Sequence, residues 1–142
     1  MTAKEYLQQV YLIKRKIKRL QDRREDLRAD LYSVKSPSDL PEIRVQTSLT
    51  GDKMLELVAK VDELERGIIA EIDRLTDKKQ QIISEIENVP NENHRQLLFE
   101  RYILCLKWEQ ISIDMDKSIR WIYAMHGVAL NQFKEVLMKK VV

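Results

Sequence analysis

Hydrophobic positions recur at alternating spacings of four and three residues along the first segment of the chain. The series is Tyr6, Val10, Ile13, Ile17, Leu20, Arg24, Leu27, Leu31 and Val34. A repeat of 3.5 residues that is kept over several heptads is typical of a coiled-coil seam rather than of a merely amphipathic helix. The pattern therefore predicts a long helix over about residues 3–34.

The periodicity then stops and resumes further along the chain. Two prolines and two serines between Ser36 and Pro41 predict a linker over residues 35–51, with Asp52 as the cap of a second long helix. This helix is expected to end near Asn88, just before Pro90. Its apolar stripe is Met54, Val58, Val61, Glu65, Ile68, Ile72, Leu75, Lys79, Ile82 and Ile86. The stripe is widened by Leu57, Leu64, Ile69 and Ile83, so this helix is expected to contact more than one neighbour.

The opposite net charges of these two helices favour an antiparallel hairpin. Residues 1–35 carry a net charge of +5 and residues 36–89 a net charge of −5. Counting outward from the linker places Arg24 near Glu65, so one hypothesis is that the two pair across the hairpin; the other is that each reaches solvent independently. Alternatively, the first seam pairs with its own copy in another chain, or both arrangements occur. Residues 1–89 are thus predicted to form a coiled-coil domain that supports a dimer or higher homo-oligomer.

After Pro90 the helices become shorter and aromatic residues gather. The spacing predicts helices over about Glu92–Leu104 and Trp108–Met115, a tight turn at Asp116 and Lys117, and a third helix capped by Ser118. Its predicted inward stripe is Ile122, Met125, Ala129, Leu130 and Phe133. A short helix, a turn of about three residues and a further helix are the plan of a helix-turn-helix unit, which we assign to residues 90–142.

The start of the third helix is the candidate DNA-reading element. In a helix-turn-helix unit these turns enter the major groove, while helix N-terminal amides and basic side chains hold phosphates. Lys117 and Ser118 are therefore expected at phosphates and Arg120 at a base edge, with Trp121 and Tyr123 against sugars or thymine methyl groups. The remaining candidates are Ala124, which offers little for base contact, and His126. Gly127 is interpreted as a site of close packing against the helix that begins at Glu92, or as a hinge.

The C-terminal third resembles a known family. The residues that carry the likeness are Arg101-Tyr102, Trp108-Glu109-Gln110-Ile111, Ser118-Ile119-Arg120-Trp121-Ile122-Tyr123 and His126-Gly127-Val128-Ala129-Leu130. They are similar to region 4 of sigma factors and, more closely, to small phage proteins that carry this unit behind a long helical arm. The likeness covers about residues 93–138, and the arm resembles the group more loosely through Arg44-Val45-Gln46 and the helix from Asp52 to Glu87. It implies a phage or prophage transcriptional regulator. Cys105 stands where these proteins usually have Gly, and Lys107 where they have a Ser or Thr cap.

Composition narrows the function classes. His94, Cys105 and His126 have no metal-ligand spacing, the three glycines are isolated, and no nucleophile is paired with a base. We therefore expect no enzyme, no metal and no cofactor. A single Cys fits a reducing cytoplasm, here that of a bacterial host, and the chain has neither an apolar run long enough for a membrane span nor a signal-peptide pattern.

Three functions remain, all within an all-α chain. The leading one is a transcriptional regulator that binds double-stranded DNA and could also contact RNA polymerase. The second is a protein-interaction adaptor that grips RNA polymerase or another regulator without reading DNA. The third is a packaging accessory that binds DNA without specificity. The basic run Lys14–Arg28 could clamp DNA, although such a run is more often the solvated face of a coil.

Overall fold

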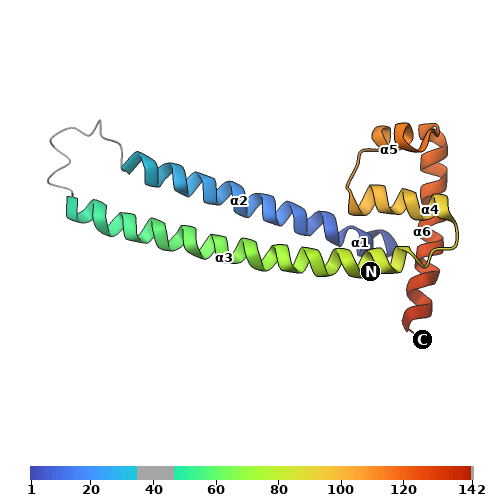
Figure 1. Cartoon of the computed structure of the whole chain (residues 1–142), viewed down its shortest axis with the longest axis horizontal. Coiled ribbons are helices and arrows are strands. Elements are labelled where there is room, and N and C mark those ends of the chain that lie inside the picture. The colour runs from blue at the N-terminus through green and yellow to red at the C-terminus, as the bar shows by residue number, and fades with distance from the viewer. Residues whose placement is uncertain (35–46, 142) are drawn as a thin grey trace. The chain divides into compact units, whose positions relative to one another are not determined.

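The chain is mostly helical in the part that the structure describes. The computed structural model describes the backbone of residues 1–34 and 47–141 and the side chains of residues 1–32 and 51–140, and no strand occurs in these ranges. The elements are α1 (Ala3–Leu7), α2 (Gln9–Val34), α3 (Thr47–Ile86), α4 (Glu92–Leu98), a π-helical turn η2 (Phe99–Ile103), α5 (Trp108–Met115) and α6 (Ile119–Val141) (Figure 1). The predicted all-α class, with long helices followed by short ones, is confirmed.

The first predicted helix is interrupted near its start. Thr2 caps α1 through a capping box: its hydroxyl accepts from the Glu5 N–H (3.1 Å) while the Glu5 carboxylate accepts from the Thr2 N–H (3.1 Å). Gln8 then separates α1 from α2. Residues 3–34 therefore form two helices rather than one.

The second long helix begins earlier than its sequence suggests. Residues 35–46 lie outside the described residues, and with them Arg44-Val45-Gln46 and most of the predicted linker 35–51. Residues 47–51 belong to α3, so the predicted start at Asp52 is wrong. A glycine inside a helix costs only about 1 kcal/mol, so Gly51 does not stop it. At the other end, Asn88 and Val89 donate to the carbonyls of Glu85 and Ile86 and close the helix before Pro90.

The described chain divides into two compact units that do not follow the predicted boundary near residue 89. The base unit comprises residues 1–14 and 74–142, and the arm comprises residues 15–73. The first turns of α2 and the last turns of α3 thus group with the C-terminal helices. Each unit is described by itself below.

In the arm, α2 and α3 run antiparallel (Figure 1), and ion pairs join them. Lys16 Nζ lies 2.8 Å from Glu71 Oε1, and the Arg28 guanidinium pairs with Glu65. The predicted pairing of Arg24 with Glu65 is therefore wrong. Arg24 lies 3.3 Å from its neighbour Glu25, whereas Arg28, one turn further along the same helix, reaches Glu65.

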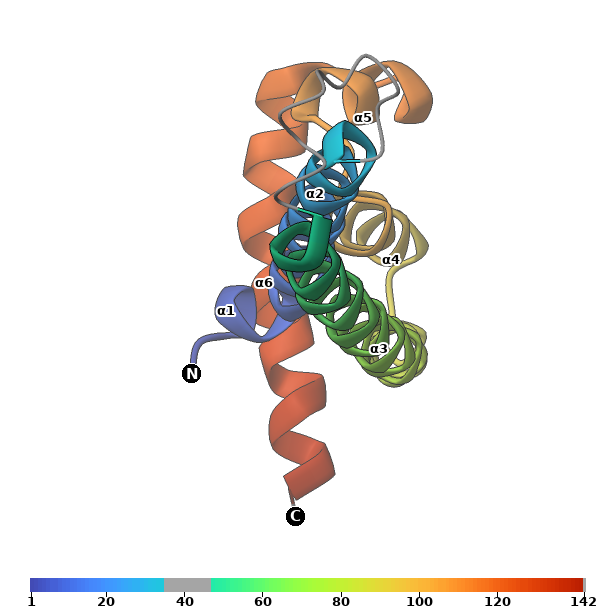
Figure 2. The same cartoon turned by 90° about the vertical axis from the view of Figure 1, so that its left-hand side faces the viewer.

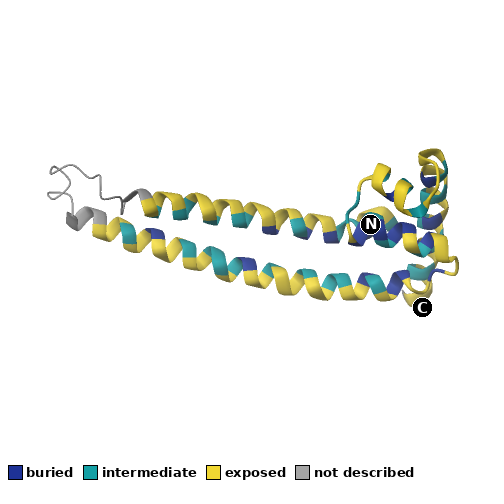
Figure 3. Ribbon diagram, turned by 45° about the horizontal axis from the view of Figure 1, so that its top comes forward, coloured by how far each residue is buried: buried dark blue, intermediate teal, exposed yellow. Residues whose placement is uncertain are grey.

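The arm has a thin apolar core. Its buried hydrophobic residues are Ile17, Leu57 and Ile68, while the seam residues Leu20, Arg24, Leu27, Leu31 and Glu65 are only half-buried. Ile72, predicted to be on the seam, is 42% exposed. α3 carries two adjacent apolar lines, and the one through Leu57, Val61, Leu64 and Ile68 is turned inward. Figure 3 shows the resulting alternation of half-buried and exposed turns along the arm.

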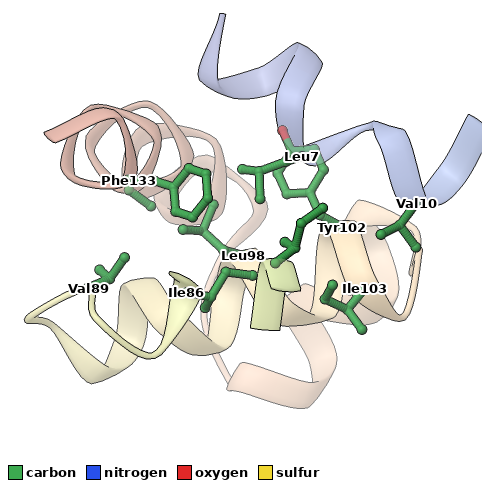
Figure 4. Close-up of a cluster of buried hydrophobic side chains, with 10 residues drawn as sticks. Leu7, Val10, Ile86, Val89, Leu98, Tyr102, Ile103 and Phe133 are labelled. Carbon is green, nitrogen blue, oxygen red and sulfur yellow. The ribbon is translucent and has the colours of Figure 1, made fainter. Parts of the chain in front are cut away.

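The base unit holds the larger core. Its α6 packs against α1, α4 and α5 (Figure 2), and the start of α2 and the end of α3 complete the cluster. The buried members of this cluster, all labelled in Figure 4 except Ile82 and Ala129, are Leu7, Val10, Ile82, Ile86, Val89, Leu98, Tyr102, Ile103, Ala129 and Phe133. Each fully buried Leu, Ile or Phe contributes about 1.5–3 kcal/mol, so this cluster is the main source of the unit's stability.

Candidate nucleic-acid interface

A sharp turn joins α5 to α6. Asp116 ends α5 in the left-handed conformation (φ 52°), where its N–H donates to the Ile113 carbonyl (3.3 Å). The Lys117 N–H donates to the Ser112 carbonyl (3.1 Å), and the Ser112 hydroxyl donates to the Lys117 carbonyl. These bonds satisfy helix-end carbonyls in the manner of a Schellman motif. Ser118 then caps α6, since its hydroxyl accepts from the Trp121 N–H (3.1 Å), which confirms the predicted cap.

A small second core holds the two helices together. Leu97 from α4, Ile111 from α5 and Ile122 from α6 are fully buried. The residues packed around them are Leu106, Trp108, Met115, Trp121 and Met125. The predicted inward stripe of α6 is confirmed, because Ile122, Ala129 and Phe133 are fully buried and Met125 and Leu130 half-buried.

Trp108 is the centre of an aromatic brace at the start of α5. The Arg101 guanidinium lies 4.2 Å from the Trp108 ring centroid and donates to the Leu106 carbonyl (2.9 Å). On its other sides the ring meets Tyr123 edge-on at 5.4 Å and His126 at 4.7 Å. A cation over an indole face is favourable by about 0.5–2 kcal/mol, so Arg101 fixes the entry of α5.

His126 lies behind the candidate surface rather than on it. The side chain is half-buried, and its Nε2 is 2.6 Å from the Tyr102 hydroxyl oxygen. Burial, reinforced by the nearby positive charges of Lys4 and Arg101, lowers the pKa of His126 to about 4. The ring is therefore uncharged near neutral pH, and the structure gives no support to His126 as a DNA-contact residue.

The helix before α5 ends in a widened turn. Residues 92–104, predicted as one helix, divide into α4 and η2, where the Leu104 N–H reaches back to the Phe99 carbonyl (3.1 Å). Cys105 follows in the left-handed conformation (φ 57°). Lys14 Nζ donates to the Ile103 carbonyl (2.9 Å) and so satisfies the end of the turn. The helix formed by α4 and η2 is thus closed by a lysine from α2.

Glu100 is a buried carboxyl at this turn. Burial raises its pKa to about 7, and the hydrogen bond and negative charge of Asp114 on α5 add to the rise. Tyr102 is shifted for the same main reason: burial raises the pKa of its hydroxyl to about 12, although Arg101 opposes the change. The joint between η2 and α5 therefore favours a proton on Glu100 at slightly acidic pH.

Most of the predicted DNA-contact residues are exposed around the start of α6. Lys117, Ser118, Arg120, Tyr123 and Ala124 are exposed within two turns. Trp121 is half-buried in the small core, and Lys117 Nζ lies 5.2 Å from its ring centroid. The structure therefore exposes a lysine, an arginine and a tyrosine near the N-terminus of this helix.

An exposed line continues from Arg120 along α6. It consists of Arg120, Ala124, Gly127 and Asn131, which we call the outer ridge. The interpretation of Gly127 as a close-packing site is wrong, because a Cβ at this position would meet nothing within 4 Å. The spacing of four, three and four residues from Arg120 was a signal in the sequence that placed Gly127 on this face.

Sequence reasoning also missed an exposed apolar side chain on α5. Ile113 is 81% exposed, and Ile119 at the start of α6 is 38% exposed. Within the described residues no three His, Cys, Asp or Glu side chains are placed to hold a metal ion. In the same part of the chain, no helix is long and apolar enough to cross a membrane.

Comparisons of the chain with protein-family models, with curated proteins and with solved structures find no match.

Proposed function

We propose that this protein is a phage-type transcriptional regulator that binds duplex DNA through α5 and α6. The observation that carries the proposal is the exposed start of α6, where Ser118 caps the helix and Lys117, Arg120 and Tyr123 surround its N-terminus. The inward side of the same helix is occupied by the core, so its outward side is free to meet a groove.

Each exposed group has a role that its chemistry supports. The helix N-terminus and the Lys117 ammonium attract phosphate, which positions the helix without reading sequence. The Arg120 guanidinium can donate two hydrogen bonds to a guanine edge. Further along the outer ridge, Ala124 and Gly127 are small enough to let the sugar-phosphate backbone approach α6 closely.

Assembly of two copies and action beside RNA polymerase complete the proposed function. Because Lys117, just before α6, and Arg120, in its first turn, are the only Lys or Arg residues from Asp116 to Met125, one such helix is a weak DNA reader, and the arm is proposed to bring two units together. The resemblance to sigma region 4 supports action in the cytoplasm of a bacterial host, with RNA polymerase as a further partner.

A second candidate function, the protein-interaction adaptor, is favoured by Ile113. An isoleucine that is 81% exposed is an unusual feature of a DNA-binding surface, where polar and basic residues dominate. In this alternative the same unit contacts RNA polymerase or another regulator through α5.

Selection from a random duplex pool, followed by fluorescence-anisotropy titration of the full chain over a salt series, tests the proposal. Specific regulation predicts one enriched sequence that binds at least about a thousandfold more tightly than scrambled DNA. Equal affinity for all duplexes with a steep salt dependence would instead indicate a DNA-packaging accessory. Absence of binding at low salt would overturn the proposal in favour of the adaptor.

Two substitutions separate base reading from phosphate contact. Arg120→Ala is expected to cost about 1–3 kcal/mol on the selected sequence and to relax discrimination, whereas Lys117→Ala should weaken all duplexes alike and reduce the salt slope by about 1. Lys134→Ala is the matched control, because Lys134 is also an exposed cation of α6 but lies several turns from its N-terminus. Parent-like binding by both test variants would show that the site is misassigned.

A further inference from the structure

The side of α3 that faces away from α2 carries an ordered set of exposed residues. Leu55, Val58 and Ile69 are 71%, 48% and 60% exposed, although all three are large and apolar. Between them lie Asp62 and Arg66, an ion pair with both side chains more than half exposed. We call these five residues the outer face of α3; they span about 21 Å of helix at 1.5 Å per residue.

The outer face is complementary to itself when it is turned end for end. Antiparallel pairing about residue 64 places Asp62 opposite Arg66 of a second copy, and Arg66 opposite the second copy's Asp62. The same register sets Val58 against an exposed alanine, Ala70, and Ile69 against another, Ala59, so that large side chains meet small ones. In a parallel pair, by contrast, each charge would face its own like.

We infer that a second copy of this chain docks antiparallel on the outer face of α3. The docking gives two reciprocal ion pairs at the centre and two apolar contacts on each side of them, as a two-fold axis requires. This inference specifies the assembly expected of the arm but does not depend on DNA binding, and it can be tested without DNA.

The thin core of the arm gives the docking a physical reason. A two-helix hairpin cannot enclose its seam, and the arm has only three buried hydrophobic residues among its described side chains. Burying Val58 and Ile69 against Ala70 and Ala59 of the second copy removes apolar area from water at about 25 cal/mol per Å². The Asp62–Arg66 pairs, which contribute little while they are solvated, set the orientation.

Charge exchange tests the central pairs in sedimentation-velocity experiments on the full chain. The parent is expected to be a dimer. Asp62→Arg and Arg66→Asp each place like charges opposite one another and should raise the dimer dissociation constant by at least about tenfold. The double variant Asp62→Arg/Arg66→Asp restores opposite charges and should dimerise like the parent.

The matched control is Asp26→Arg, which makes the same change at an exposed position of α2. A monomeric parent, or dimers of unchanged affinity in both single variants, would overturn the inference. Circular dichroism confirms that each variant is folded, which exposed positions should allow.

Cysteine cross-linking tests the orientation. In a Cys105→Ala background, a mixture of Ala59→Cys and Ile69→Cys chains should form a disulfide-linked dimer upon oxidation. Neither chain alone should do so, because the antiparallel register pairs position 59 with position 69. Efficient self-linking of the Ala59→Cys chain would indicate a parallel pair and contradict the inference.

Discussion

Two residues other than glycine hold the left-handed backbone conformation at the turns that shape the candidate interface. Cys105 (φ 57°) closes the helix before α5, and Asp116 (φ 52°) closes α5 itself. Side chains with a Cβ are disfavoured there, although Asp and Asn are tolerated better than most. The thiol offers little in return, since its nearest polar partners lie 3.7–3.9 Å away.

Glycine at these positions should therefore stabilise the fold. Cys105→Gly is expected to raise the free energy of unfolding by up to about 1 kcal/mol, and Asp116→Gly by less, because relief of the left-handed strain outweighs the added flexibility of the unfolded chain. Urea unfolding measures both. Cys105→Ala is the control, because it removes the sulfur but keeps the Cβ; a gain as large as that of the glycine variant would contradict the explanation.

Gly127 offers the opposite case, a glycine that no backbone or packing constraint requires. Gly127→Ala should raise the free energy of unfolding by about 1 kcal/mol, because it is an exposed interior position of α6 with open space around it. Thermal melting checks this. If the outer ridge also lies against DNA, the same variant should bind the selected duplex less tightly; unchanged affinity would remove Gly127 from the interface.

At the scale of the elements, periodicity predicted those helices that have one apolar face. α6 has a single stripe from Ile122 to Phe133, and the structure buries it as predicted. α3 has two adjacent stripes, so sequence alone could not say which would face α2. The register of α2 against α3 differs by one helical turn from the predicted one, so Arg28 and not Arg24 pairs with Glu65.

The closure of the helix before α5 could not be read from the local sequence. The widened turn η2 is completed by Lys14, whose ammonium binds the Ile103 carbonyl from a part of the chain 89 residues away. Burial of Tyr102 against His126 likewise depends on the packing of α6. Such long-range contacts explain why the local sequence does not show that His126 is half-buried.

The joint between η2 and α5 should give stability an unusual pH dependence. The folded state holds a proton on Glu100 up to about pH 7, whereas the ordinary pKa is 4.5, so the contribution of Glu100 to the free energy of unfolding should fall as pH rises through this window. His126 acts oppositely: its pKa is lowered from 6.5 to about 4, so its neutral burial adds stability as pH rises from 4 to 6.5.

Glu100→Gln separates the two contributions. In the parent the two contributions offset each other over most of this range, so the variant, which lacks the falling Glu100 contribution, should show a clear rise due to His126 in urea unfolding from about pH 4 to about pH 8. His126→Gln should show the reverse. Parallel profiles for the parent and Glu100→Gln would mean that Glu100 does not hold its proton in the folded state.

At the scale of the whole molecule, the base unit is assembled from two distant stretches of chain. Leu7 and Val10 are fully buried in the same cluster as Ile82, Leu98 and Phe133. The candidate interface therefore rests on a core to which the first residues contribute, and the predicted boundary at residue 89 would cut through it.

Two shortened chains test this dependence. A chain in which a flexible linker replaces the arm (residues 15–73) should unfold cooperatively, because it keeps the whole base unit. A fragment of residues 74–142 lacks Leu7 and Val10, and since losing one such side chain costs about 2–5 kcal/mol, it should melt far lower. Equal melting temperatures would show that residues 1–14 do not support the fold.

The split base unit also sets an order of events during synthesis. Leu7 and Val10 are synthesised before the arm, but their partners in α3, α4 and α6 follow only after it. The arm can close by contacts along neighbouring stretches while the first residues wait exposed. A nascent chain therefore completes the two cores of the base unit only after Ile122, Ala129 and Phe133 of α6 have followed, and a premature stop before Ile122 yields a product that lacks the α6 side of both.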